Sequence, residues 1–265
     1  MKIFVNKLRS FAFSFLFYMR HPGIMLRNLN TYKNTNFAHK NFIQSSPRIS
    51  IIIVTYNAID NIRLCLESLH RYKPMDADVI VVDNNSEDAV KNYLREAKNK
   101  GLIDQLELSS DNYYYVKGNN IGARLSRVTS KYLLLLNSDI EIKHTNWMDI
   151  LLANAPQKGI ISFGKTDIPV IRPDGWCFLI DRNLFMELGG LNEYYQMNWG
   201  ITDLTGRAAK ANYEIRSIIN PADYIIHYGQ QSHSFLKKGT AKFNNMDYRE
   251  IVELFKKSSV QLLRV

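Results

Sequence analysis

The 265-residue chain has few cysteines, prolines and glycines, and each scarcity excludes a class of protein. Seven prolines and 13 glycines exclude collagen-like and proline-rich architectures. The two cysteines, Cys65 and Cys177, lie in apolar surroundings, so we expect buried thiols in a reducing compartment and not a disulfide framework. No Cys or His pair has zinc-ligand spacing, and neither a Gly-x-Gly-x-x-Gly nor a Walker loop occurs. Ordinary dinucleotide-binding and P-loop proteins therefore lack their motif here.

The chain also lacks acidic residues over its first 48 positions. Residues 1–48 contain eight Lys or Arg, whereas the rest of the chain contains 26 bases and 25 acids. The net charge of +9 therefore belongs to the N-terminal segment. A nucleic-acid enzyme would spread such charge over its folded surface, so we expect no nucleic-acid partner.

The N-terminal segment, residues 1–48, is also rich in phenylalanine. Its apolar stretch, residues 11–19, is shorter than the roughly 20 residues of a membrane-spanning helix, and no signal-peptide cleavage site follows it. Two interpretations remain: a basic, aromatic-rich helix at an anionic membrane surface, or a helix that packs on the body or on a second subunit. The first is favoured, because exposed phenylalanines without a partner promote aggregation. Residues 28–48 are expected to be a linker.

From residue 49 onward, continuous apolar runs alternate with helical periodicity. Buried strands are predicted at residues 49–54, 79–82 and 132–136, a weaker one at 106–108, and a helix over 118–130. This order is typical of an α/β protein with a mostly parallel sheet covered on both faces. Ser86 is expected to cap the helix after the second run.

Polar residues follow each of the three strong strands. The runs end in Thr55-Tyr56-Asn57, Asp83-Asn84-Asn85-Ser86 and Asn137-Ser138-Asp139. Ligands of open α/β sheets bind at the carboxyl ends of the strands, so Asp83 and Asp139 are expected to point into one cleft. The alternative is that these residues only make turns and helix caps.

Five segments together resemble a known family. They are ISIIIVTYNAIDNIRLCLESL, VIVVDNNSED, KGNNIGARLS, KYLLLLNSDIEI and DGWCFLIDRNLFMELGGLNEYY. In this order they resemble the inverting family-two glycosyltransferases of the GT-A fold, and most closely the bacterial branch that builds capsule, lipopolysaccharide or other surface polysaccharide. DLTGRAAKANYEI and IIHYG resemble the end of the catalytic domain.

The resemblance implies a nucleotide-sugar donor, linked to UDP, dTDP or GDP. The residues that it implies for the nucleotide are Thr55, Asn57, Asp83, Asn119, Asn120 and Asn137. Asn137-Ser138-Asp139 stands in the place of the family's Asp-x-Asp motif, so Asp139 would bind Mg²⁺ or Mn²⁺ with help from His227. A divalent cation neutralises a departing diphosphate and prefers oxygen ligands. The alternative for His227 is an ordinary histidine at a strand end.

The sequence departs from the family where the general base is expected. The family's Glu-Asp pair falls on Gly200 and Ile201, which accept no proton. Asp203 is the hypothetical base, and Arg207 would pair with Asp203 or with the donor diphosphate. Otherwise the base is unusual or catalysis is weak, and Asp203 only caps a helix at residues 204–211.

On the acceptor side, Trp176 and Trp199 would stack on a sugar, with core packing as their alternative. Together these features predict a metal-dependent glycosyltransferase at the inner face of the cell membrane. It would be cytoplasmic and act on a glycan or lipid-linked acceptor. The segments are 1–48, a GT-A domain at 49–236 and a helical tail at 237–265. A homodimer, an inactive nucleotide- or glycan-binding scaffold and a nucleotidyltransferase are the alternatives.

Overall fold

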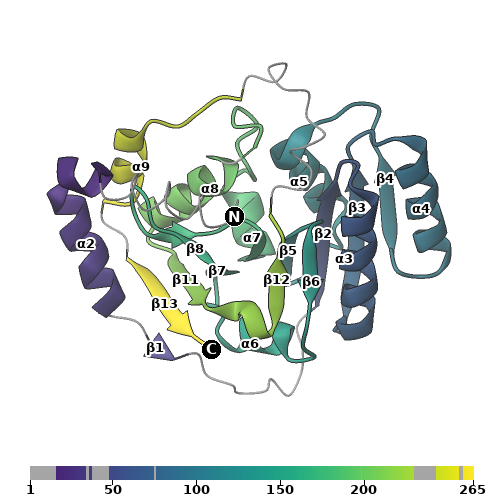
Figure 1. Ribbon diagram of the computed structural model, residues 1–265, viewed down its shortest axis with the longest axis horizontal. Helices are drawn as coiled ribbons and strands as arrows, with labels where there is room; N and C mark the ends of the chain where they lie inside the picture. Colours follow the sequence, from purple (N-terminus) through teal and green to yellow (C-terminus); the bar gives the residue numbers. More distant parts are fainter. Residues whose placement is uncertain are drawn as a thin grey trace, which may run out of the picture.

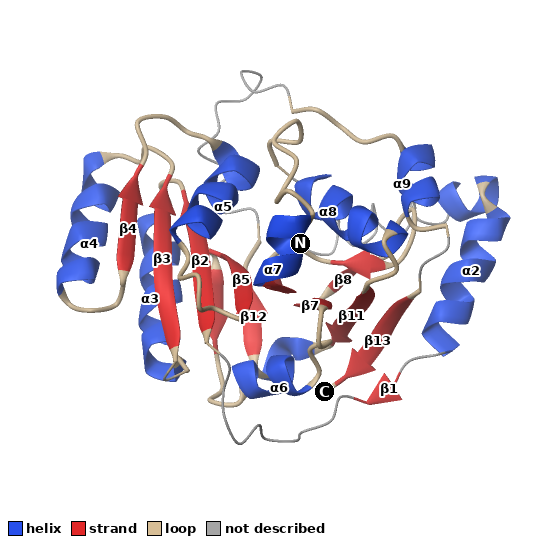
Figure 2. Ribbon diagram, turned by 180° about the vertical axis from the view of Figure 1, so that it is seen from behind, coloured by secondary structure: helices blue, strands red, loops and turns tan. Residues whose placement is uncertain are grey.

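The computed structural model describes residues 16–33, 36–37, 48–74, 76–197, 199–229, 243–256 and 259–265. Its centre is a nine-stranded sheet (Figures 1 and 2). In sheet order the strands are β1 (Asn36–Phe37), β13 (Val260–Arg264), β11 (Glu214–Ile219), β7 (Gly159–Phe163), β10 (Cys177–Asp181), β5 (Tyr132–Asn137), β2 (Ile49–Thr55), β3 (Ala77–Asp83) and β4 (Gln105–Leu108). Among these, only β10 is antiparallel to its neighbours, β5 and β7. The α/β class and the mostly parallel sheet are therefore confirmed.

Helices cover both faces of this sheet (Figure 2). On one face lie α3 (Ile59–Tyr72), α4 (Asp88–Asn99) and α6 (Trp147–Ala153). On the other lie α5 (Tyr114–Leu125), α7 (Arg182–Glu187) and α8 (Trp199–Lys210). Two short antiparallel pairs complete the body: β6 (Ile140–Ile142) with β12 (Ile225–His227), and β8 (Lys165–Thr166) with β9 (Arg172–Pro173). A 3₁₀ turn, Pro221–Asp223, precedes β12.

The apolar runs are continuous because both faces of each central strand are covered. In β2, Ile51 and Ile53 pack in the core under α3 and α4, whereas Ile52 packs in the core under α5. Helix α5 approaches β2 very closely. A Cβ atom on Gly122 would lie 2.3 Å from Ile52 Cγ2, so only glycine allows this contact.

The two ends of the chain depart from their predictions. The tail is not wholly helical: α9 (Tyr248–Leu254) is followed by β13, which pairs with β11 and with β1. Residues 28–48 are not simply a linker, since α2 (Pro22–Lys33) and β1 occupy part of this range. A five-residue apolar segment is too short for its periodicity to distinguish strand from helix. Residues 237–242 lie outside the described residues.

Two local predictions are also wrong. Ser86 does not cap α4, because its hydroxyl accepts from the Asn57 backbone N–H at 2.7 Å and Glu87 is the N-cap residue. Helix α5 begins at Tyr114, four residues before the predicted start. The backbone of Tyr114 has φ 59°, a left-handed conformation that is costly for a tyrosine.

The N-terminal segment is helical at residues 16–20 and in α2. Phe17 is buried and its ring packs edge-on against the Tyr248 ring of α9 at 5.6 Å. Four of the phenylalanines in the predicted membrane element, Phe4, Phe11, Phe13 and Phe15, lie outside the described residues. In the described ranges, no helix has both the length and the apolar composition of a membrane span.

Candidate active site

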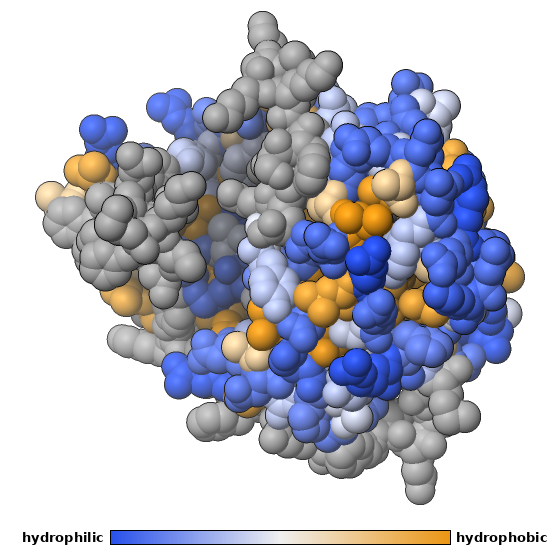
Figure 3. Space-filling model, turned by 45° about the vertical axis from the view of Figure 1, so that its right-hand side comes forward, coloured by the Kyte–Doolittle hydropathy of each residue, from blue (hydrophilic) through white to orange (hydrophobic). Residues whose placement is uncertain are grey.

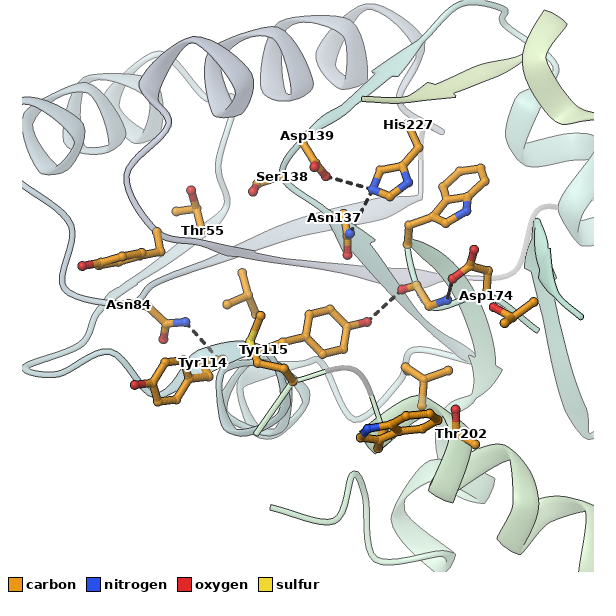
Figure 4. Close-up of a pocket in the computed structure, with 18 of the residues that line it drawn as sticks. Thr55, Asn84, Tyr114, Tyr115, Asn137, Ser138, Asp139, Asp174, Thr202 and His227 are labelled. Carbon is orange, nitrogen blue, oxygen red and sulfur yellow. Dashed lines mark hydrogen bonds and ion pairs between the residues drawn. The ribbon is translucent and has the colours of Figure 1, made fainter. Parts of the chain in front are cut away.

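The carboxyl ends of β2, β3 and β5 meet at one edge of the sheet. The register places Thr55 opposite Asp83 and Val54 opposite Asn137. A cavity of about 510 Å³ opens at this edge, and side chains from β2, α5, β9 and α8 also line it (Figure 4). The predicted cleft at the strand ends therefore exists.

Unsatisfied oxygen atoms gather at one end of this cavity. Thr55 Oγ1 and Asn84 Oδ1, from residues that line the cavity, and Asp83 Oδ1, beneath its wall, are buried and have no hydrogen-bond partner among the described residues. Asn84 Nδ2 donates to the Tyr114 carbonyl at 3.0 Å, which fixes the amide beside the Tyr114 wall (Figure 4). Buried acceptors without partners are costly, so this end of the cavity suits a ligand that carries several donors.

Asp139 and His227 come together in the middle of the cavity wall. Strand β12 pairs with β6, which puts His227 opposite Ile140 and next to Asp139. His227 Nε2 lies 3.2 Å from Asp139 Oδ1 and 3.2 Å from Asn137 Nδ2 (Figure 4). The Trp176 ring stacks on the imidazole with centroids 5.2 Å apart, which holds the imidazole plane.

The donor atoms of Asp139 and His227 fit a divalent cation. Neighbouring ligands of an octahedral ion with bonds of about 2.1 Å lie about 3.0 Å apart, close to the 3.2 Å found between these two atoms. Within the described ranges no cluster of three or more His, Cys, Asp or Glu side chains would hold a metal ion. The pair therefore suits a cation that takes its other ligands from a bound phosphate and water.

The far side of the cavity is built from aromatic and charged side chains. The Tyr115 hydroxyl donates to the Gly175 carbonyl at 2.8 Å and ties α5 to the start of β10. Burial raises the pKa of the Tyr115 phenol, so this hydroxyl stays protonated. Trp199 lines the cavity and donates through Nε1 to Asn245 Oδ1 at 3.1 Å. Arg172 and Asp174 line the same side.

The structure brings half of the predicted site residues to this cavity. Those that line it are Thr55, Asn137, Asp139, Trp176, Trp199 and His227. The others do not: Asn57, Asp83, Asn119, Asn120, Asp203 and Arg207.

Three of the residues outside the cavity make hydrogen bonds to the backbone: Asn57 and Asn120 to loops, and Asn119 within α5. Asn57 Oδ1 accepts from the Glu87 N–H at 2.9 Å, and Asn119 Nδ2 donates to the Tyr115 carbonyl at 2.8 Å. Asn120 accepts from the Leu191 N–H and donates to its carbonyl, at 2.9 and 2.8 Å. Their placement favours positioning of the cavity wall over direct contact with a ligand.

Asp83 lies beneath the cavity wall. It is fully buried, and its Oδ2 accepts from the Ser86 N–H at 3.0 Å. Burial raises the pKa of its carboxyl, and the hydrogen bonds from Ser86 oppose this shift.

Asp203 and Arg207 line a second cavity, on the other side of α8. Asp203 neither opens nor caps its helix, because α8 begins at Trp199. The predicted pairing of the two residues is confirmed: Arg207 Nη2 lies 2.7 Å from Asp203 Oδ2. The same guanidinium donates to the carbonyls of Leu188 and Gly190. The structure thus separates Asp203 from Asp139, and its role as general base stays a prediction.

Sequence reasoning assigned no role to several residues that line the cavity. They are Asn84, Arg172, Asp174 and Thr202. The sequence could have indicated Asn84, because it follows Asp83 at the end of a predicted strand. The sequence indicates Arg172 and Asp174 more weakly, as a polar pair with strand spacing at an Asp-Gly turn.

The family assignment rests on a profile match together with this geometry. The profile of "Glycosyl transferase family 2" matches residues 50–187, about half of the chain. The chain belongs to glycosyl transferase family 2. The predicted resemblance and the GT-A fold are thereby confirmed, and the protein is a glycosyltransferase by family.

Individual relatives are distant. The chain is 28% identical over 184 residues to the teichoic acid poly(glycerol phosphate) polymerase of Staphylococcus epidermidis, a match over 67% of this chain and 23% of that protein. The chain therefore spans less than a quarter of the length of this relative.

Solved structures show the fold. A mannosyltransferase from Pyrobaculum calidifontis, in complex with GDP-Man and Mn²⁺, superposes with a TM-score of 0.61 and 19% identity over 84% of this chain and 70% of that one. The structure of GalNAc-T7 with UDP, GalNAc and Mn²⁺ superposes with a TM-score of 0.59 and 15% identity, over 70% of this chain and 44% of that one.

Proposed function

We propose that this glycosyltransferase moves a sugar, with inversion, from a nucleotide diphosphate donor to a glycan or lipid-linked acceptor of a bacterial surface polymer. The observation that carries the proposal is the juxtaposition of Asp139 and His227 in one cavity with the unpaired oxygens of Thr55 and Asn84. A nucleotide diphosphate needs both features, because the hydrogen-bond donors of its nucleoside require acceptor oxygens and its phosphates bind a cation.

The nucleoside would occupy the end of the cavity near Thr55, Asn84 and Tyr114. There the unpaired side-chain oxygens would accept from the base and the ribose, and the Tyr114 ring would cover an apolar face. The two solved structures named above contain GDP-Man and UDP, which supports a nucleotide donor of this kind. UDP, GDP and dTDP sugars are the candidates.

Asp139 and His227 would hold Mg²⁺ or Mn²⁺. When bound, the cation would act as a Lewis acid on the charge of the departing diphosphate. The Trp176 stack keeps the imidazole plane fixed, and Asn137 Nδ2 approaches the same ring nitrogen at 3.2 Å. The fixed ring plane prepares the imidazole for a ligand, and because Nε2 has a single lone pair the cation would take the place of the Asn137 amide at this nitrogen. The Mn²⁺ in both solved structures supports the choice of metal.

The acceptor would enter beside Trp176 and Trp199. Both rings line the cavity, and each presents a face suited to stacking on a sugar ring. The link from Tyr115 to Gly175 closes this region on the side of α5 and would exclude water from the sugar. The name of the Staphylococcus epidermidis relative supports a cell-wall polymer as the acceptor class.

The N-terminal helices would place the enzyme at the inner membrane surface. Met19 is 70% exposed and Leu26 64% exposed, and the bases Arg20 and Arg27 lie on the same segment. By contrast, hydrophilic residues cover most of the side of α3 and α4 (Figure 3). Apolar side chains interspersed with bases are typical of an interfacial helix, and a lipid-linked acceptor lies at that surface.

One observation favours a second function, a non-catalytic nucleotide-binding scaffold. Gly200 and Ile201 stand where the family carries its acidic pair, and Ile201 lines the cavity without any group that accepts a proton. A scaffold would bind a nucleotide diphosphate but would not turn it over.

The experiment is a turnover screen of UDP, GDP and dTDP sugars with Mn²⁺, read as released nucleoside diphosphate. The wild type is compared with Asp139→Ala and with the surface control Asp223→Ala. We expect one donor to be turned over by the wild type and by the control, and a loss of turnover in Asp139→Ala. Binding without turnover of any donor, even with lipid-linked acceptors, would favour the scaffold. No binding would refute the assignment.

A further inference from the structure

The main cavity contains few groups that could accept a proton from an acceptor hydroxyl. Among its described lining residues, Asp139 and Asp174 are the carboxylates. Asp139 is paired with His227, and both would be used by the cation. Tyr115 donates its proton to the Gly175 carbonyl and is held protonated by burial. Asp174 is therefore the carboxylate left for acid–base chemistry.

The backbone fixes the Asp174 side chain. Its Oδ1 accepts from the Gly175 N–H at 2.9 Å, which forms a tight turn directly before β10. Its other oxygen, Oδ2, has no hydrogen-bond partner among the described residues and is available to a substrate hydroxyl. Figure 4 shows Asp174 on the side of the cavity opposite Thr55 and Asn84, with Asp139 between the two ends. A nucleotide over Thr55 would therefore place its sugar toward Asp174.

The turn at Asp174 packs directly against the side chain that replaces the family's acid. A Cβ atom on Gly175 would lie 2.9 Å from Ile201 Cγ1, so the two residues are in contact across the cavity wall. The position that usually supplies the base, at the start of α8, is thus adjacent to the start of β10. The Asp174 carboxylate, in the turn between β9 and β10, reaches the same region of the cavity.

A buried cation, Arg172, lies two residues before this carboxylate in the chain. Arg172 is only 6% exposed, and its Nε donates to Thr202 Oγ1 at 3.1 Å. Burial lowers the pKa of the guanidinium to about 10, and the charges of Asp174, Tyr248 and Asp167 oppose this shift. Arg172 is thus charged at neutral pH and forms no salt bridge within 4.0 Å in the described part of the chain.

We propose that Asp174 is the general base of the transfer. This inference rests on the proposed function. The Asp174 carboxylate takes the proton of the acceptor hydroxyl while the acceptor oxygen forms a bond to the anomeric carbon. The bond from that carbon to the diphosphate oxygen breaks, and its electron pair leaves with the nucleoside diphosphate. The proton ends on Asp174, so charge and atoms balance.

The test uses the full chain and the nucleotide sugar that the wild type hydrolyses, with water as the acceptor. Asp174→Asn keeps the acceptor for the Gly175 N–H and removes only the basic oxygen, so the turn is preserved. We expect kcat to fall by about 10²–10⁴-fold, with unchanged Tm and unchanged affinity for the nucleoside diphosphate and Mn²⁺. Any residual rate should lose the acidic limb of its pH profile. Asp174→Glu should retain measurable turnover, and Asp223→Asn should behave like the wild type.

The outcomes separate this inference from the proposed function. A wild type that turns over none of the donors, either with water or with a lipid-linked acceptor, overturns both. An active wild type with an equally active Asp174→Asn overturns the inference alone. An equal loss in Asp174→Asn and Asp174→Glu, with a lowered Tm, would assign Asp174 to the turn only and also overturn it. A loss confined to Asp203→Asn would return the base to α8.

Discussion

Replacement of Gly122 by alanine has two opposite effects on stability, a gain in helix propensity and a loss of packing. Alanine in the middle of a helix is favoured over glycine by about 1 kcal/mol. Here its Cβ would lie 2.3 Å from Ile52 Cγ2, well inside van der Waals contact, and Ile52 is fully buried between the sheet and α5. Overpacking of a dense core costs about 1–3 kcal/mol and here exceeds the gain, because the contact is with a branched side chain that has no free space.

We therefore expect Gly122→Ala to lower the free energy of unfolding by about 1–2 kcal/mol. For a domain of this size the Tm should fall by about 2–8 °C. Thermal unfolding followed by circular dichroism measures this change. Gly23→Ala is the matched control, because a Cβ on Gly23 meets no atom within 4 Å, and it should be neutral or slightly stabilising. A Gly122→Ala variant as stable as the wild type would refute the close approach of α5 to β2.

Three further predictions concern charge and burial. Asp203→Ala should lower the free energy of unfolding by about 1.5–3 kcal/mol in urea, because Arg207 loses its carboxylate partner. Burial raises the pKa of the Asp83 carboxyl in the folded state, so the protonated carboxyl stabilises the fold and this stabilisation is lost as the pH rises above the pKa of the unfolded chain, about 4. The free energy of unfolding of Asp83→Asn in urea should therefore increase relative to that of the wild type between about pH 3 and about pH 7. Burial raises the pKa of Cys65 to about 12 and also raises that of Cys177, so at about pH 8 a thiol reagent should label neither before unfolding. Labelling of the native protein would contradict their burial.

The central sheet and the cleft could be predicted because their signals are local. The runs of β2, β3 and β5 are apolar at every position, as expected for strands buried on both faces, and each ends in polar residues. Parallel strands bring such ends to one edge, so a cleft lined by Asp139 followed from pattern and topology, but Asp83, which was expected to point into the same cleft, lies buried beneath its wall.

Other parts of the site depend on contacts between distant segments, which no local pattern encodes. His227 reaches Asp139 only through the pairing of β12 with β6, which no local pattern predicted; a role for His227 beside Asp139 came only from the family resemblance. Asp203 was placed at a helix start because its spacing fits a cap, but α8 begins five residues before the expected start at residue 204, with Ile201 packed in the core, and Asp203 lines the second cavity. Tertiary packing overrode the local signal there.

Contacts between distant segments also explain why the structure of the chain ends was predicted wrongly. Strand β13 is only five residues long, and its partners β11 and β1 lie far from it in the sequence. Periodicity over so few residues fits a helix as well as a strand. The strand forms because it extends the parallel sheet and buries Leu262 against α9 and β11.

The most direct test of the account is calorimetric titration of the protein with UDP, GDP and dTDP, with and without Mn²⁺. The central claim is that Asp139 and His227 hold the cation that binds the diphosphate. If they do, Mn²⁺ should strengthen the binding of one nucleotide at least tenfold, which is about 1.4 kcal/mol of binding free energy. Asp139→Asn and His227→Ala should lose this increase, whereas Asp223→Asn keeps it. Equal binding with and without Mn²⁺, or an undiminished effect of Mn²⁺ in Asp139→Asn, would contradict the account.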